Sequence, residues 1–256
     1  MPKISMRVLM VVVCLSLSSA VWAAPQDQSS DATDSEAPPP MVPDRPGFGS
    51  GTGVVSPAHL LAEGGVTYTR SETVKSLNTP NLLFRLGLVD FAELRVGAPS
   101  LQISGLGTGG ITNDLGPLTI GSKLATDLSE QVRVGVIPQV DLDVSNVSNS
   151  GAGLTGLITL KADDNVAVDA NLLVFNVKDG PDDRDFEYTF TTAAGFGIVG
   201  DLGGYVEFYA IFGEEAPATF ADAGLTYLVV PRLQFDAFAG VALPDSTTFN
   251  LGGGIT

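Results

Sequence analysis

Cysteine and histidine are nearly missing from this sequence of 256 residues, which contains one of each. The cysteine, Cys14, lies in an apolar N-terminal run, and Val11, Val12 and Val13 precede it where a lipoprotein signal would need small residues. Without that run the chain has no thiol for a disulfide or for a cysteine-based metal site. The lone His59 cannot form a histidine metal cluster, and no Gly-x-Ser-x-Gly motif is present. The sequence therefore predicts that the protein is not an enzyme and has no catalytic residue, no metal-binding residue and no cofactor.

Long apolar runs and basic residues are also scarce. No stretch after Leu17 approaches the ~18 consecutive apolar residues of a transmembrane helix. Lysine and arginine number 13 against 29 aspartates and glutamates, and the formal net charge is -16. This balance argues against a nucleic-acid partner, which requires a basic surface. Part of the acidic charge lies in residues 27–36, so it does not identify a specific partner.

The N-terminus has the pattern of a secretion signal. Lys3 and Arg7 make it positively charged, Val8–Leu17 is a short apolar run, and small residues lead to a predicted cleavage site after Ala23. The apolar run is too short for a helix that crosses ~30 Å of hydrocarbon. We therefore expect the chain to be exported and residues 1–23 to be removed as a signal peptide.

Residues 24–58 form a separate acidic, proline- and glycine-rich segment that we expect to lie in the periplasm. Pro38, Pro39 and Pro40 follow an acidic stretch, as in an extended spacer. Residues 43–53 differ, because they are rich in glycine and have little apolar mass. Two interpretations stay open for this segment, a linker or a short plug in the mouth of a barrel.

From residue 59 onward, apolar and polar side chains alternate with the period of two that indicates β-strands. The pattern is clearest where Val132, Val134 and Val136 fall on one face and Arg133 falls on the other. About twelve strands of roughly ten residues follow from it, the length that a tilted membrane strand needs. They cover residues 60–69, 81–88, 92–98, 118–124, 132–143, 158–161, 168–174, 187–198, 206–212, 221–229, 233–241 and 248–255.

The connections between these strands alternate in length. Short ones are expected at 89–90, 127–130, 163–165, 200–204 and 230–232. Longer ones are expected at 71–79, 104–115, 145–153, 178–185 and 214–218, with a shorter last member at 244–246. Short periplasmic turns alternating with longer external loops are typical of outer-membrane barrels, whereas a soluble sandwich has no reason to alternate in this way. The sequence thus predicts an all-β protein: a transmembrane up-and-down antiparallel β-barrel in residues 59–256, located in the cell outer membrane.

If the apolar face of each strand meets lipid, the charged residues must point into the lumen, because a midplane charge on the lipid face costs ~2–4 kcal/mol. The candidate lumen and substrate-path residues are Glu63, Arg85, Glu93, Arg95, Lys123, Arg133, Asp141, Asp143, Lys161, Asp169, Glu187, Glu207, Asp222 and Asp236. Both signs are interleaved, so these residues either pair across strands and fill the barrel or line a polar conduit. Small eight-stranded barrels are filled by side chains and barrels of sixteen strands hold open channels, so about twelve strands indicate a narrow path at most.

Two short stretches resemble a known family. Pro43–Phe48 leading into Gly64–Tyr68 is similar to the start of the outer-membrane transporters named for the meta-pathway of phenol degradation. Leu83–Leu88 followed by Ala92–Gly97 is similar to the most recognisable hairpin of that family. The resemblance covers residues 43–256, and the charged residues that match the family pattern are Arg85, Glu93 and Arg95.

The resemblance implies a barrel that passes small organic compounds, often aromatic or hydrophobic ones. Our first hypothesis is accordingly a passive channel for such solutes. The alternative is a non-conducting structural barrel of the outer membrane with a lumen filled by ion pairs. For partners, we expect outer-membrane lipid, the barrel-assembly machinery during biogenesis and, under the first hypothesis, a small-molecule solute.

Overall fold

The computed structural model describes residues 40–256 apart from 108–109, 180–182, 214–216 and 245–246. The predicted signal peptide, residues 1–23, and residues 24–39 lie outside the described residues, and the four internal gaps fall in predicted external loops. In the described part of the chain, no helix has the length and apolar character that crossing a membrane would require.

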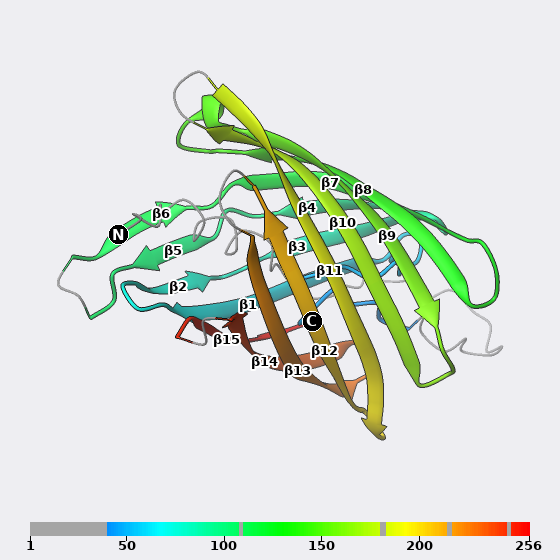
Figure 1. Ribbon diagram of the computed structural model, residues 1–256. Coiled ribbons are helices and arrows are strands. Elements are labelled where there is room, and N and C mark those ends of the chain that lie inside the picture. Colours follow the sequence, from blue (N-terminus) through cyan, green and yellow to red (C-terminus); the bar gives the residue numbers. More distant parts are fainter. Residues whose placement is uncertain (1–39, 108–109, 180–182, 214–216, 245–246) are drawn as a thin grey trace, which may run out of the picture.

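Fifteen strand segments form one antiparallel sheet that closes on itself (Figure 1). In chain order they are β1 (Leu60–Arg70), β2 (Lys75–Thr79), β3 (Leu83–Val89), β4 (Ala92–Gly97), β5 (Leu101–Ser104), β6 (Thr112–Leu115), β7 (Leu118–Asp127), β8 (Val132–Leu142), β9 (Gly151–Lys161), β10 (Val166–Asp179), β11 (Asp183–Val199), β12 (Leu202–Phe212), β13 (Ala218–Val230), β14 (Leu233–Leu243) and β15 (Phe249–Ile255), with a 3-10 turn η1 (Val147–Asn149) before β9. The barrel is closed by β1 and β15, which pair from Gly64 opposite Ile255 to Arg70 opposite Phe249. Among the described strands only the short β6 has a single neighbour, β5, and the long strands form a ring without a free edge, which is the condition for a sheet to span a membrane.

Three strands of the barrel are each divided in two at a proline. Pro80 separates β2 from β3, Pro99 separates β4 from β5, and Pro117 separates β6 from β7. Proline has no backbone N–H to donate, so the ladder is interrupted at these points. The two halves of each strand keep the same neighbour, because β3 pairs with β4 and β2 pairs with β5. The fifteen segments are therefore twelve strands of an up-and-down barrel, as predicted.

The external loops are shorter than expected, and this corrects the sequence-based boundaries. Residues 71–79 and 104–115 are expected to be loops, but β2 and β6 occupy the last residues of each range. Those residues are strand continuations beyond a proline, where polar side chains hide the alternation. The hairpin of β10 and β11 is also longer than the expected ten residues per strand, at 14 and 17 residues, and it extends past its neighbours (Figure 1).

The sheet buries its charged residues and exposes its apolar ones. Glu63, Arg85 and Lys123 have no exposed area, whereas Phe84 and Leu86, on either side of Arg85 in β3, are 38% and 37% exposed. This is the reverse of a soluble protein, in which charged residues are almost never fully buried unless paired. An apolar outer face around a charged interior is the arrangement of a transmembrane barrel. The predicted orientation of the two faces of β3 is thus the observed one.

Candidate functional site in the barrel lumen

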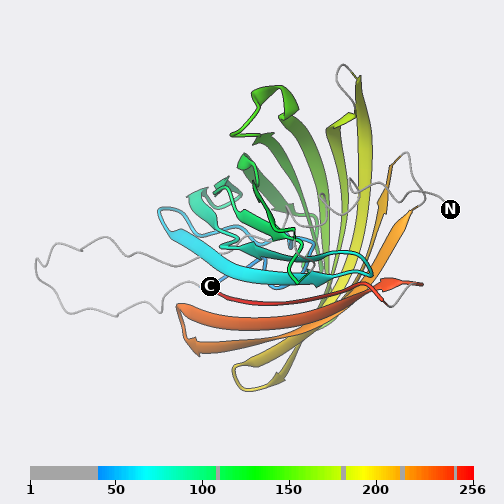
Figure 2. The ribbon, with the colours of Figure 1, turned by 90° about the vertical axis from the view of Figure 1, so that its left-hand side faces the viewer.

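Residues 40–57, called the inner segment from here on, lie inside the barrel (Figure 2). The inner segment precedes β1 in the chain and forms no strand of its own. Every second residue from 47 to 53 is glycine, so the backbone can approach the barrel wall closely. Its contacts with inward-facing side chains make up the candidate site.

Glu207 on β12 binds the backbone of the inner segment. Its carboxylate oxygens accept hydrogen bonds from the N–H groups of Phe48, at 2.5 Å, and of Gly49, at 2.8 Å. A side chain at position 49 would not fit, because its Cβ would lie 2.5 Å from Thr191 Oγ1 and 2.8 Å from Asn171 Oδ1. Glycine at this position therefore permits the two hydrogen bonds to Glu207.

The segment continues past β10 and β9 through polar contacts of the same kind. Asn171 on β10 accepts a hydrogen bond from the Ser50 N–H at 2.7 Å and donates one to the Ser50 carbonyl at 2.9 Å. Thr52 donates to Thr159 Oγ1 on β9 through its N–H, at 3.2 Å, and through its hydroxyl, at 2.7 Å. Thr159 in turn donates to the carboxylate of Asp169. The wall thus binds mainly the backbone of the inner segment.

Three cations of the wall surround Asp44 of the inner segment. Lys123 Nζ on β7 lies 2.8 and 3.1 Å from the Asp44 oxygens, and Arg95 Nη1 on β4 lies 2.6 Å and Arg85 Nη1 on β3 lies 3.6 Å from Oδ2. We call Arg85, Arg95 and Lys123 the basic cluster. Burial raises the pKa of Asp44, but the positive charges of the basic cluster lower it more, and the pKa of Asp44 lies well below its ordinary value of 3.8. Asp44 is therefore a carboxylate throughout the physiological pH range.

Two glutamates of the wall balance part of the basic cluster. Arg85 binds Glu93 through two nitrogen atoms, with Nε at 2.7 Å and Nη2 at 3.0 Å from the carboxylate oxygens. Glu93 also accepts the N–H of Val55 at 2.8 Å. Glu63 on β1 accepts the N–H of Asp44 at 3.1 Å and lies 3.4 Å from Arg85 Nη1. With Asp44 in place, three cations and three carboxylates meet, and the group has no net charge.

Arg45 fixes the inner segment to another part of the wall. Its Nε and Nη2 donate to the two carboxylate oxygens of Asp236 on β14, both at 2.8 Å, and the two side chains are 2% and 0% exposed. The guanidinium lies against the backbone of β1, where a Cβ at Gly65 would be 2.6 Å from Arg45 Nη1. Such bidentate arginine–carboxylate pairs are both strong and specific in geometry. The neighbouring residues 44 and 45 thus bind wall regions of opposite charge.

An aromatic stack adds an apolar contact to this set. The ring of Phe48 stacks on Tyr209 of β12 with centroids 4.4 Å apart and an interplanar angle of 6°. Tyr209 in turn stacks on Phe220 of β13 at 4.8 Å and 14°. Stacked pairs of this kind contribute ~0.5–1.5 kcal/mol beyond their buried area.

Most of the predicted lumen residues meet around the inner segment. Those that contact it directly are Glu63, Arg85, Glu93, Arg95, Lys123, Arg133, Glu207 and Asp236. Asp169 takes part through Thr159, and Asp222 is an inward-facing buried residue of β13. Glu187 is half-buried on β11.

Three predicted lumen residues lie elsewhere. The carboxylate of Asp143 accepts hydrogen bonds from the N–H groups of Ser145 and Asn146, so it organises an external loop and does not face the inner segment. Asp141, at the outer end of β8, accepts a hydrogen bond from the hydroxyl of Thr119. Lys161 is exposed at the end of β9. Alternation places all three side chains inward. Asp143 turns toward its loop, as residues at strand ends can, whereas Asp141 is part-buried and bonded to Thr119 and Gln139, apart from the contacts of the inner segment.

Asp44 and Arg45 are absent from the residues predicted to form the site. The available signal was the stretch Pro43–Pro46, in which two opposite charges stand between prolines within a glycine-rich segment. Thr159 and Asn171, which also bind the inner segment, are not among the predicted site residues either. Alternation locates a side chain on a face of the sheet and carries no information about a partner outside the sheet.

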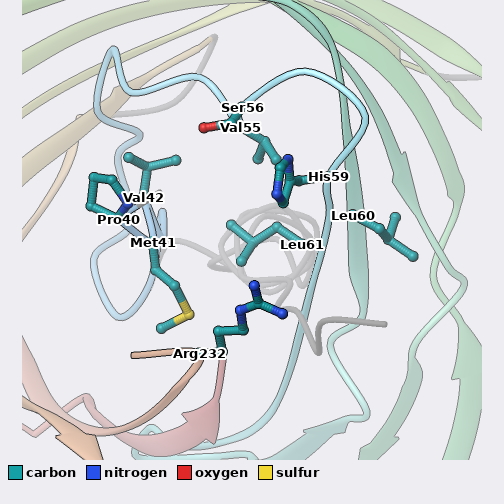
Figure 3. A pocket seen from close by; sticks show the side chains of 9 residues that line it. All are labelled: Pro40, Met41, Val42, Val55, Ser56, His59, Leu60, Leu61 and Arg232. Atoms are coloured by element: carbon teal, nitrogen blue, oxygen red, sulfur yellow. The ribbon is translucent and has the colours of Figure 1, made fainter. Parts of the chain in front are cut away.

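A small pocket lies where both ends of the inner segment meet the start of β1 (Figure 3). Met41 and Val55 line it from the inner segment, and Arg232 lines it from the turn between β13 and β14. Its volume of about 40 Å³ accommodates a few water molecules. His59 at its rim lies with Nδ1 2.9 Å from the Pro57 carbonyl oxygen. Within the described ranges no group of three or more histidine, cysteine, aspartate or glutamate residues is placed to hold a metal ion.

Known families and structures place this arrangement in context. A family model described as "Putative MetA-pathway of phenol degradation" matches residues 43–253, which include most of the inner segment and nearly the whole barrel. No curated protein matches the chain. The structure is similar to that of the NanC porin, with 10% identity and a TM-score of 0.57 over 76% of this chain and 98% of that chain. It is also similar to the KdgM porin in complex with disordered oligogalacturonate, with 10% identity and a TM-score of 0.54 over 76% of this chain and 96% of that chain. At such identities the similarity establishes the fold, which is that of porin barrels.

Proposed function

This chain belongs to the family described as "Putative MetA-pathway of phenol degradation", and on that premise we propose that it is a passive channel of the outer membrane for small organic compounds, aromatic or hydrophobic ones among them. In this proposal the inner segment is a movable plug that closes the lumen. Residues 1–23 direct export and are cleaved after Ala23, and the barrel-assembly machinery inserts the barrel into outer-membrane lipid.

The observation that carries the proposal is that polar groups of the wall take their partners from a segment outside the wall. Glu207 accepts two backbone N–H groups of the inner segment, and Asp236 pairs with Arg45. A barrel built only for structure would pair such residues across its own strands. Wall groups that bind a separate segment instead can bind water or a polar part of a solute once the segment moves.

The character of these contacts supports movement. Most of them are hydrogen bonds, each with a net stabilisation of ~0.5–1.5 kcal/mol, because water replaces the lost partner when the bond opens. Apart from the stack of Phe48 on Tyr209, the glycine-rich part of the segment has few side chains to bury. The inner segment is thus held by many replaceable contacts and not by an apolar core.

A non-conducting structural barrel is the second candidate, and the basic cluster is the observation that favours it. Arg85 and Lys123 are completely buried, and their charges are neutralised by Asp44 and two glutamates. Opening this group exposes or separates buried charges, which is unfavourable unless new partners replace the old ones. In this candidate the inner segment is a permanent part of the interior.

An engineered disulfide between the inner segment and the barrel wall, which can be formed and then reduced, distinguishes the movable plug from the structural barrel. Thr52 of the inner segment and Thr159 of β9 have their hydroxyl oxygens 2.7 Å apart, so cysteines at both positions can form a disulfide with an S–S distance of ~2 Å. We would reconstitute the full-length T52C/T159C protein in liposomes and measure the flux of a panel of small organic solutes after oxidation and again after reduction. Protein-free vesicles give the background, and the T52C and T159C single variants control for oxidation.

The proposal expects flux in the reduced double variant and in both single variants, and a loss of flux in the oxidised double variant that reduction restores. Flux that is the same in the oxidised and reduced double variant would refute a movable plug. Absence of flux for every solute in the wild-type protein and in the reduced variants would favour the structural barrel.

A further inference from the structure

We propose that the basic cluster, Arg85, Arg95 and Lys123, is a carboxylate-binding site of the lumen. Asp44 occupies this site in the structure, and the carboxylate group of an organic solute occupies it when the inner segment is displaced. The inference rests on the proposed function, because the solute can reach the cluster only if the inner segment moves. It adds a chemical class, organic monocarboxylates, to the solutes of the channel.

Lys123 finds its hydrogen-bond acceptors in the inner segment. Its ammonium group donates to Asp44 Oδ1 at 2.8 Å and Oδ2 at 3.1 Å, and to the carbonyl oxygens of Gly51 at 2.8 Å and Gly53 at 3.1 Å. All four acceptor atoms belong to the inner segment. Displacement of the segment therefore removes these partners from a side chain that has no exposed area in the closed state. Once the segment has left, Lys123 pairs with water or, through charge-assisted hydrogen bonds, with the carboxylate of a solute.

The wall around Asp44 carries more positive than negative formal charges. Without Asp44, the wall contributes three cations, Arg85, Arg95 and Lys123, and two carboxylates, Glu63 and Glu93. One positive charge is then uncompensated. A single carboxylate restores neutrality, whereas a neutral solute leaves the charge in place and a dianion overcompensates it. The cluster thus favours monocarboxylates.

The donors around Asp44 also have the geometry of a carboxylate site. The two glutamates already engage Arg85, since Glu93 binds its Nε and Nη2 and Glu63 lies 3.4 Å from its Nη1. The donors that hold the two oxygens of the Asp44 carboxylate, at 2.6–3.1 Å, are Lys123 Nζ and Arg95 Nη1, and the latter also donates to Glu93 at 2.9 Å. Charge-assisted hydrogen bonds of this length are the strong ones. The positions of these donors therefore match two oxygens of one carboxylate.

The test compares two aromatic solutes that differ in one group. Full-length protein in liposomes at pH 7 is given 3,5-dihydroxybenzoate or 3,5-dihydroxybenzamide, and each rate is corrected for protein-free vesicles. The measured quantity is the ratio of the carboxylate rate to the amide rate at low solute concentration. The variants are Asp44→Asn, which removes the competing carboxylate, and Lys123→Met, which removes a cation of the site. Asp127→Asn is the matched control, since Asp127 pairs with Arg133 at 3.1 Å and both residues lie outside the basic cluster.

We expect the ratio of carboxylate rate to amide rate to exceed one in the wild type. Asp44→Asn should raise this ratio by about tenfold, the effect of one charged hydrogen bond. Lys123→Met should abolish the preference for the carboxylate. Asp127→Asn should leave the ratio unchanged. Asp44→Asn changes a residue outside the strands, so it keeps the test decisive if Lys123→Met does not fold. Equal rates for both solutes in the wild type and in Asp44→Asn would overturn the carboxylate site while leaving the channel intact. No flux of either solute in any of these proteins would overturn the proposed function itself.

Discussion

The ion pair between Arg45 and Asp236 holds the inner segment to β14, and breaking it from one side should release the segment. Both side chains are almost completely buried, and two nitrogens of one donate to two oxygens of the other at 2.8 Å. Arg45→Met leaves the Asp236 carboxylate buried without its partner, and Asp236→Leu leaves the guanidinium in the same condition. Removing one partner of a buried pair costs ~3–5 kcal/mol, mostly because the remaining charge is stranded.

The double variant Arg45→Met/Asp236→Leu strands neither charge. Replacing a buried pair by apolar side chains of similar volume is often neutral for stability. The docked state of the inner segment should therefore be destabilised by ~3–5 kcal/mol in each single variant and by less than ~1.5 kcal/mol in the double variant. At ~1.4 kcal/mol for each power of ten, the single variants should open roughly two to four powers of ten more often.

Hydrogen exchange measured by mass spectrometry gives this opening directly, without relying on transport. The reporting amides are those of Phe48, Gly49 and Ser50, whose N–H groups are bound by Glu207 and Asn171. Their exchange should accelerate strongly in each single variant and return close to the wild-type rate in the double variant. Exchange in the double variant at least as fast as in the single variants would show that the charges do not determine docking.

Three further predictions use the same segment and barrel. Gly49→Ala should weaken docking of the inner segment by ~1–3 kcal/mol, because its Cβ would lie 2.5 Å from Thr191 Oγ1. At Gly51 the nearest atom would lie 3.6 Å from a Cβ, so Gly51→Ala should leave the amide exchange of residues 43–53 unchanged. The pKa of Asp44 is lowered in the folded state, so its contribution to docking should be complete above its ordinary pKa of 3.8 and be lost as the pH falls through the lower folded-state value. The difference in exchange between the wild type and Asp44→Asn should accordingly be constant from pH 7 to pH 5, and a difference that shrinks over this range would contradict the assignment. The closed barrel should migrate differently in unboiled and boiled samples on a detergent gel, and identical migration would contradict a closed sheet.

Alternation of side chains was sufficient to predict the barrel, because lipid and lumen impose opposite requirements on successive residues of every strand. Phe84 and Leu86 face outward and Arg85 faces inward, as the sequence predicts. The strand ends were predicted less well. Pro80, Pro99 and Pro117 were not recognised as interruptions within continuing strands, since a proline beside polar residues has the same appearance as the start of a loop.

The inner segment could be predicted to exist but not to dock where it does. Residues 43–53 have no period, so the sequence left a linker and a plug equally open. The decisive contacts are made by single residues, above all Asp44 and Arg45, whose partners on β7 and β14 are far away in the chain. Such pairing depends on which wall residues lie at the same level along the barrel axis. That level is set by the register and tilt of the strands, which a single sequence does not specify.

Arg85 binds both ends of the inner segment. It donates to the carbonyl oxygen of Val42 at 2.6 Å and to that of Gly53 at 3.0 Å. Both ends therefore lie together at one mouth of the barrel, and the residues between them form a loop that enters the lumen from that side. A loop of this kind is never threaded through the ring of strands. The first and last strands can consequently join before the loop arrives, so assembly of the barrel and occupation of its interior are topologically independent steps.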